Sequence, residues 1–228
     1  MKRYFAGFAL GALFASSALG ADLSVFTPQA EVPDAPVYAD PVLDWTGFYA
    51  GVLGGYGFGD TTLSGGQSAG IPTNGLLGGV TVGGNMQYDQ FVYGVESDLA
   101  WNGQSGSATC GAATCGADFD WNGSLRARAG YAFDPVLVYA TGGLAVAGIN
   151  TNVAPAPGGT TGTHSATYFG WTVGGGLEAA ITEQLSAKTE YAYSHFGDQI
   201  APAGTLASTA TTVSPSSHTV KVGLNFRY

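Results

Sequence analysis

Residues 123–145 read GSLRARAGYAFDPVLVYATGGLA, and this stretch decides the fold class. Its first part alternates apolar and polar residues, as in residues 125–128 (LRAR), and a second strand-like run follows the short sequence FDP at residues 133–135. A period of two residues is that of a β-strand with two different faces, and a three-residue break leaves room only for a tight turn. The stretch therefore predicts two strands joined by a turn, with apolar side chains on one face and arginines on the other.

Eight segments with this period fill the chain after Trp45. They are residues 46–59, 76–88, 91–101, 118–132, 136–149, 167–180, 184–197 and 217–228. Three connections between them are tight, and four are about fifteen residues or longer and rich in Gly, Ser, Thr, Ala and Pro. The tight connections are residues 88–90, 133–135 and 181–183, and the long ones are residues 60–75, 102–117, 150–166 and 198–216. Long and short connections alternate without exception.

This alternation is typical of transmembrane barrels, which have short periplasmic turns, long outer loops and an even number of strands. The sequence thus predicts an all-β fold: an eight-stranded antiparallel up-and-down transmembrane β-barrel with four long outer loops and three short periplasmic turns. The barrel domain would span residues 45–228, with both of its ends on the periplasmic side.

Composition limits the classes of protein to which the chain can belong. Glycine provides 37 of the 228 residues, and charged residues provide only 10%, against about 25% in typical soluble proteins. The 12 Tyr, 12 Phe and 4 Trp exclude a disordered chain. The net charge of −9 and the pI of about 4.4 exclude a nucleic-acid partner. So small a charged fraction is unusual for a protein whose surface faces water alone.

The polar face of the predicted strands carries both signs of charge. Its nine charged residues are Glu96, Asp98, Arg126, Arg128, Glu178, Lys188, Glu190, Lys221 and Arg227. Charges enclosed in a barrel must be paired, and these five basic and four acidic groups nearly balance. The sequence therefore predicts an ion network that fills the lumen and limits conduction. Counting residues from the periplasmic end matches Glu96 with Arg128, Asp98 with Arg126 and Glu190 with Lys221, and it places Lys188 near Glu178.

Two environments fit a barrel with one apolar and one polar face. A soluble carrier of the lipocalin type would place the apolar face inside, whereas a membrane barrel places it against lipid. The balanced charges favour the membrane barrel, and so do aromatic residues at strand ends, where interfacial girdles lie. One rim would carry Trp45, Phe48, Tyr88, Phe91, Tyr131, Phe226 and Tyr228, and the other Tyr56, Phe58, Trp101, Trp121, Trp171 and Tyr193.

The N-terminal part of the chain has the features of an export signal. Lys2 and Arg3 precede an apolar run that ends in small residues, which predicts a cleaved secretory signal peptide over residues 1–20. Residues 21–44 hold four of the ten prolines and five acidic groups, which predicts a solvated periplasmic segment, either a spacer or a tail without a role.

Few other residues suggest chemistry. Cys110 and Cys115 lie in one predicted outer loop, and an even cysteine count in an exported protein predicts a disulfide between them. Two thiols do not complete a metal site. The histidines His164, His195 and His218 map to the outer half, one in a loop and two on the lipid-facing phase. No grouping of residues supports catalysis, so we expect a protein that is not an enzyme and needs no cofactor.

Several stretches resemble a known family. They are DWTGFYAGVLGGYGFG (44–59), YGVESDLAW (93–101), GSLRARAGYAFDPVLVYATGGLA (123–145), GWTVGGGLE (170–178), SAKTEYAYSHFG (186–197) and HTVKVGLNFRY (218–228). They are similar to the small outer-membrane β-barrel proteins of alphaproteobacteria, a porin-like family within the OmpA-like transmembrane barrel group. The sequence departs from the family at Leu53, where a polar lumen residue is usual, and at Tyr228, where Phe is commoner.

The resemblance implies an exported protein of the Gram-negative outer membrane with an envelope-structural and surface role and at most a narrow pore. The alternative is a surface protein that binds a ligand, including haem, or a host through its outer loops. Outer-membrane lipids and lipopolysaccharide would surround it. The family's insertion machinery would read an assembly signal in the last strand, formed by Val220, Val222, Leu224, Phe226 and Tyr228.

Overall fold

The computed structural model describes residues 43–66, 68–154 and 162–228, and the predicted signal peptide and nearly all of the segment 21–44 lie outside them. All the regular structure in these residues is β-strand. The strands are β1 (Gly47–Gly65), β2 (Ala69–Tyr88), β3 (Phe91–Asn102), β4 (Ser105–Cys110), β5 (Ala113–Phe133), β6 (Val136–Ala154), β7 (Gly162–Ala180), β8 (Leu185–Phe196), β9 (Gln199–Ala201) and β10 (Thr211–Arg227).

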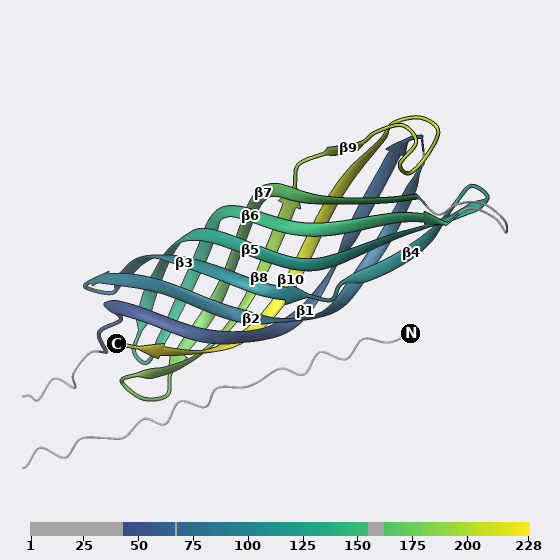
Figure 1. Cartoon of the computed structure of the whole chain (residues 1–228). Helices are drawn as coiled ribbons and strands as arrows, with labels where there is room; N and C mark the ends of the chain where they lie inside the picture. The colour runs from purple at the N-terminus through teal and green to yellow at the C-terminus, as the bar shows by residue number, and fades with distance from the viewer. Residues whose placement is uncertain (1–42, 67, 155–161) are drawn as a thin grey trace, which may run out of the picture. The chain divides into compact units, whose positions relative to one another are not determined.

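Eight long strands form a closed antiparallel ring (Figure 1). Each pairs with its neighbour along the chain, and β10 closes the ring by pairing with β1 from Tyr49↔Arg227 to Gly65↔Thr211. The short strands β4 and β9 lie outside this count, since β4 pairs with β2 and β5, and β9 pairs with β10. The predicted eight-stranded barrel is confirmed.

The three tight connections lie where the sequence predicts them. β2 and β3 are separated by two residues, β5 and β6 by two, and β7 and β8 by four. In the first of these turns Asp89 adopts a positive φ of 53°, a conformation that Asp tolerates better than most side chains.

The four long connections differ from the prediction because much of each is strand. β1 and β2 leave only residues 66–68 between them, and β4 and β5 form a hairpin within the predicted loop 102–117. β6 and β10 likewise extend into the predicted loops 150–166 and 198–216. Beyond the membrane the outward face meets water, so its residues are small and polar, and the apolar alternation that marks a lipid-facing strand is missing there.

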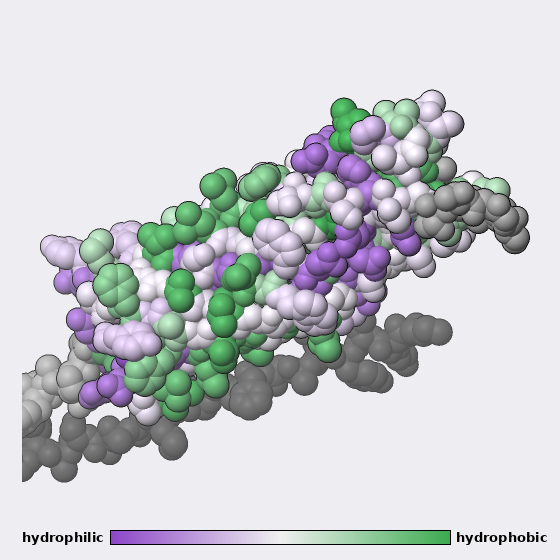
Figure 2. Space-filling model, in the orientation of Figure 1, coloured by the Kyte–Doolittle hydropathy of each residue, from purple (hydrophilic) through white to green (hydrophobic). Residues whose placement is uncertain are grey.

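The barrel surface has an apolar belt. Large apolar side chains on the outward phase of every long strand are exposed, including Phe48, Val82, Leu99, Leu144 and Val222. Figure 2 shows hydrophobic side chains over the body of the barrel and hydrophilic ones gathered toward the end that carries β4 and β9. Because the charged side chains at the level of this belt are inside, the distribution excludes the soluble-carrier alternative. No α-helix among the described residues is long and apolar enough to cross a membrane.

A β-bulge in β5 changes which residues point inward. The pairing with β6 shifts by one residue between Phe119 and Trp121. Phe119 therefore points inward on the outer side of the bulge, while Ser124 and Arg126 point inward on the other side. The one extra residue reverses which alternate residues of β5 point inward. The same strand therefore contributes Phe119 to the outer part of the interior and Arg126 to the middle part.

Candidate functional site

The middle of the barrel interior holds charged side chains from β3, β5, β7, β8 and β10. The antiparallel register sets Glu96 opposite Arg126, Glu178 opposite Lys188, and Glu190 opposite Lys221. Glycines on the inward phase make room for the larger side chains. A Cβ atom on Gly83, for example, would lie 2.4 Å from the ring of Tyr49.

Arg126 is the centre of this ion network, and its side chain is 1% exposed. Its Nη2 donates to Glu96 Oε1 at 2.5 Å and to Asp98 Oδ2 at 2.7 Å, both on the neighbouring strand β3. Its Nη1 donates to Glu190 Oε1 at 2.6 Å on β8, which is not a neighbour of β5 in the ring. The guanidinium group therefore bridges the lumen.

Arg128 forms a second bridge. It pairs with Glu178 on β7, lies 3.7 Å from Glu96 Oε2, and stacks with its guanidinium carbon 3.7 Å from the ring centroid of Tyr139. The Tyr49 hydroxyl donates to Glu96 Oε2 at 2.8 Å and accepts a hydrogen bond from Arg128 Nη1. Side chains of β1, β3, β5, β6 and β7 thus meet around one arginine.

Two lysines complete the network. Lys188 Nζ donates to Glu96 Oε2 at 2.6 Å, and Lys221 Nζ lies 2.7 Å from Asp98 Oδ2 and 2.8 Å from Glu190 Oε1. Four cations and four carboxylates are joined in this way, so the eight-membered network has no net charge. Pairing of this kind offsets the large desolvation cost of each buried charge.

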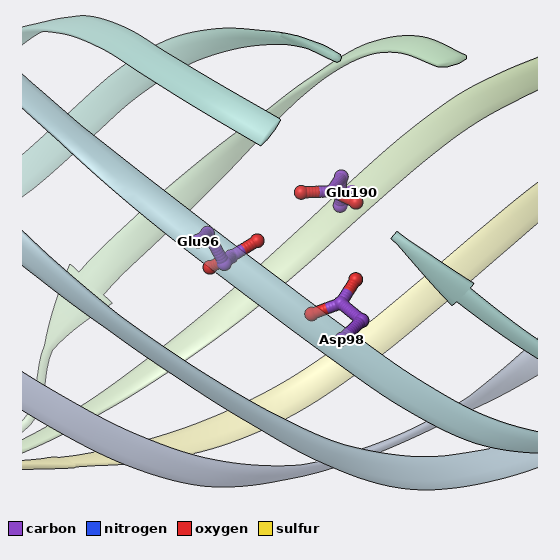
Figure 3. A group of neighbouring side chains, drawn as sticks. All are labelled: Glu96, Asp98 and Glu190. Atoms are coloured by element: carbon purple, nitrogen blue, oxygen red, sulfur yellow. The ribbon is translucent and has the colours of Figure 1, made fainter. Parts of the chain in front are cut away.

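Three of the carboxylates could be mistaken for a metal site. Glu96, Asp98 and Glu190 each offer an oxygen atom within 4.8 Å of the others, and Figure 3 shows their side chains converging in the lumen. Each of the three already contacts Arg126 and a lysine. A metal ion would have to displace these cations, so the arrangement is that of an ion-pair cluster and does not fit a metal centre.

The register differs from the heights inferred by counting residues. Arg126 lies opposite Glu96, and Ser124 lies opposite Asp98, which is a shift of two residues from the predicted matching. Counting from the strand ends treats Phe91 at the start of β3 and Phe133 at the end of β5 as level, whereas Phe91 pairs with Tyr131 because neighbouring strands of a barrel are staggered. Long side chains still bring Arg126 to Asp98, and the lysine opposite Glu178 reaches Glu96 instead.

Arg227, the ninth predicted member, lies apart at the periplasmic end. Its guanidinium carbon is 4.6 Å from the ring centroid of Trp45, and Nη1 donates to the carbonyl oxygen of Asp44 at 3.4 Å. Within residues 43–66, 68–154 and 162–228 it has no carboxylate partner within 4 Å. The other eight charges lie further along the barrel, beyond ion-pair distance from Arg227.

Trp45 is inside the barrel and is not part of the predicted rim. It is 1% exposed and packs with Val92, Leu137 and Tyr139 in an apolar cluster at the periplasmic end. Its backbone N–H donates to Gln87 Oε1 at 2.8 Å, which draws the residues before β1 into the barrel mouth. Trp45 precedes the first strand, so the alternation of inward and outward residues within a strand does not indicate which way its side chain points.

A larger apolar cluster fills the outer end of the interior, and the sequence analysis did not foresee it. Its bulkiest members are Leu63, Ile71, Phe119, Ile149, Tyr168, Phe196, Leu206 and Val213. The disulfide between Cys110 and Cys115 is present, and both side chains are buried in this cluster, not at the surface of a loop. The one signal in the sequence was the run of apolar residues at every second position at Ala145, Ala147 and Ile149.

A small polar cavity separates this outer cluster from the ion network. Phe119 and Phe196 line one end, Arg126 and Lys221 line the other, and the polar lining residues are Asn102, Asn122, Ser124, Thr172, Ser194, Ser217 and Thr219. It leaves about 20 Å³ for the centres of water molecules, enough for one or two of them.

The histidines lie away from the lumen charges. His195 and His218 have the outward phase of β8 and β10, as predicted, and the Tyr191 hydroxyl lies 2.7 Å from His218 Nδ1. His164 lies in β7 opposite Thr151, where the sequence predicted a loop.

Comparison with known proteins agrees with this architecture. Residues 29–226 match the family model of the outer membrane protein beta-barrel domain. A 22 kDa outer membrane protein of Rhizobium leguminosarum bv. viciae is 38% identical over 165 residues, which cover 72% of this chain and 69% of the relative. The 31 kDa outer-membrane immunogenic protein of Brucella melitensis biotype 1 is 32% identical over 243 residues, which cover 96% of this chain and 97% of the relative.

The fold is also similar to that of a solved outer-membrane protein. The crystal structure of OprG from Pseudomonas aeruginosa matches with a TM-score of 0.52 at 14% identity, over 81% of this chain and 98% of that one. The closed ring of strands, the apolar belt, the enclosed charges and the sequence relatives all point to the same kind of protein. This chain belongs to the outer membrane β-barrel family and is a protein of the Gram-negative outer membrane.

Proposed function

We propose that this outer-membrane barrel is a closed, non-enzymatic component of the envelope that conducts ions poorly or not at all. The observation that carries the proposal is the bridge that Arg126 makes across the lumen to Glu190, with Glu96 and Asp98 on the same guanidinium group. An eight-stranded barrel has an interior that side chains can just fill. Here the filling side chains are bonded to one another and do not line an open channel.

Three successive layers support a closed interior. The Trp45 cluster occupies the periplasmic end, the ion network the middle, and the apolar cluster around Phe119 and Ile149 the outer end. An ion that crossed would have to break charge-assisted hydrogen bonds in one layer and enter apolar packing in the other two. Each of these steps is costly in a low-dielectric interior.

Conductance in a planar bilayer tests this proposal. Purified barrel that migrates as a folded, heat-modifiable band should give no steady single-channel current, while a general diffusion porin added to the same bilayer should give large steps. The variant Trp45→Ala should remain closed, because the two other layers are unchanged. A steady current from the parent protein would contradict the closed-barrel proposal.

A second candidate function is binding of a ligand or host molecule by the outer end of the barrel. It is favoured by the strands that continue past the apolar belt, where β4 and β9 add to the sheet and the surface is largely hydrophilic (Figure 2). The Brucella relative is named an outer-membrane immunogenic protein. Labelling of an epitope inserted at residues 111–112 on intact cells would show that this end is accessible. Labelling only after permeabilisation would rule it out.

A further inference from the structure

Two histidines mark one side of the barrel at the outer limit of the apolar belt. His195 lies ten residues along the chain from Leu185, which begins β8, and His218 lies ten residues before the terminal Tyr228. A tilted transmembrane strand crosses the hydrocarbon in about 9–11 residues. Both imidazoles therefore lie where lipid headgroups begin on the outer side.

The two rings are neighbours on the same outward face. His218 pairs with Tyr193 and His195 with Ser216, so the histidines are diagonal neighbours on adjacent strands, about 7–8 Å apart between their backbones. One phosphate group, or the phosphate and sugar of one headgroup, is large enough to reach both side chains.

Aromatic side chains hold the histidines in place. His218 is stacked on Phe58 with ring centroids 5.3 Å apart, and its centroid is 4.8 Å from that of Tyr193. The ring of His195 lies 6.0 Å from Trp171. These rings restrict the two imidazoles, so less conformational entropy is lost when a ligand binds.

The hydrogen bond at His218 orients its remaining nitrogen as a donor. The Tyr191 hydroxyl lies 2.7 Å from Nδ1, and a phenol is the better donor of such a pair. The proton of a neutral ring then lies on Nε2, for which the described part of the chain provides no partner. An imidazole N–H of this kind suits a phosphate oxygen.

The remainder of the outward surface lacks cations. The seven basic residues of the whole chain are Lys2 and Arg3 in the predicted signal peptide and the five that lie within the barrel. The exposed ionisable groups toward the outer end are carboxylates, among them Asp60, Asp118 and Asp198. Among residues 43–66, 68–154 and 162–228, histidine is thus the only side chain at this level of the outward face that can carry a positive charge. An anionic headgroup finds a matching partner only on the β8–β10 side.

We propose that His195 and His218, together with Phe58, Trp171, Tyr191 and Tyr193, bind the phosphorylated sugar headgroup of an outer-leaflet glycolipid such as lipopolysaccharide. The imidazole nitrogens donate to the phosphate, and the flat aromatic rings pack against the sugar rings at headgroup depth, where Trp and Tyr are enriched. The site holds glycolipid on one side of the barrel only. This inference goes beyond the closed-barrel proposal and does not depend on it.

Native mass spectrometry of the barrel in detergent tests the site with defined lipids. Bisphosphorylated lipid A should bind about tenfold more tightly than dephosphorylated lipid A, which is the scale of a hydrogen bond to a charged group. The double variant His195→Gln/His218→Gln should lose that preference. Its affinity for dephosphorylated lipid A should not change, because Gln keeps the size and polarity of the position.

Trp101→Gln is the matched control, because Trp101 is exposed at the same level on β3 and pairs with Trp121. It should leave the tenfold preference intact, and all variants should migrate as folded, heat-modifiable bands. Equal affinity of the parent for the two lipid A forms would overturn the proposal. So would an equal loss in the Trp101 variant, or binding of phosphatidylglycerol as tight as that of bisphosphorylated lipid A. A current in a planar bilayer would contradict the closed-barrel proposal, but it would not change the measured preference for bisphosphorylated lipid A.

Discussion

The two halves of the barrel interior are built in opposite ways on the same strands. Within the membrane, the inward phase carries paired charges such as Arg126 and Glu190 and the outward phase is apolar. Beyond the membrane, the inward phase carries Ile71, Phe119 and Ile149 and the outward phase is small and polar. The solvent outside the wall therefore decides which chemistry the inside requires, while the two-residue period of the strands is unchanged.

The two halves also differ in how they respond to the substitution of a single inward-facing side chain. An apolar cluster is held by many weak, non-directional contacts, so one truncation leaves a cavity and the neighbours relax. An ion network is held by a few directional bonds in a low dielectric, so one deletion leaves a buried charge without a partner. The membrane half should be the more fragile half in response to single substitutions.

The largest effect should come from the strand that closes both halves. Phe226→Asp places a charge on the lipid face of β10, opposite Ala50 of β1, and alters the proposed assembly signal. We expect almost no folded protein in the outer membrane, with unassembled chain in the periplasm, as measured by heat-modifiable migration of membrane fractions. Deletion of Tyr228 should have the same result. Normal folded levels of both variants would refute the assembly signal.

Removal of Arg126 tests the fragility of the membrane half. Arg126→Met leaves three carboxylates without their shared cation, and the free energy of unfolding should fall by roughly 3–5 kcal/mol. Urea titration in lipid vesicles measures this loss. Arg227→Met is the control, because Arg227 lies outside the ion pairs, and it should cost roughly 1–2 kcal/mol, the scale of its hydrogen bonds and its contact with Trp45. Equal losses in the two variants would mean that the charges do not act as one network.

Truncation in the outer half should cost less. Ile149→Ala removes buried methyl groups from the apolar cluster, and we expect a loss of about 2–4 kcal/mol in the same titration. Val222→Ala on the lipid face is the control and should cost less than half as much, because lipid refills the space. If Ile149→Ala were more destabilising than Arg126→Met, the ranking of the two halves would be reversed.

The sequence predicts the membrane half well and the outer half poorly, for one physical reason. Lipid on the outside forces large apolar residues onto one face, so Val220, Val222 and Leu224 reveal the strand and its phase together. Water on the outside allows Gly, Ser and Thr, so the extensions of β1 and β2 around Leu63 and Ile71 resemble loops. Phase alone placed all nine predicted charges inside the barrel, and eight of them form the ion network, whereas Arg227 lies apart from it.

The partners within the network could not be predicted in the same way. Which charges pair depends on the stagger between neighbouring strands. This offset cannot be obtained by counting residues along the chain. The stagger sets Arg126, and not Arg128, opposite Glu96. Trp45 was missed because it precedes the first strand and its contacts with Val92 and Leu137 join distant segments.

All five basic side chains within residues 43–228 lie inside the barrel, and this has a consequence for anything that attacks the folded protein from outside. A protease of trypsin's specificity cleaves after lysine or arginine, and the folded wall offers it no accessible site. Reagents that label cell-surface proteins through lysine amines should pass over this one for the same reason, since Lys188 and Lys221 face the lumen and are held by carboxylates. A survey of surface proteins that relies on amine chemistry or tryptic shaving of intact cells would under-count this protein however abundant it is.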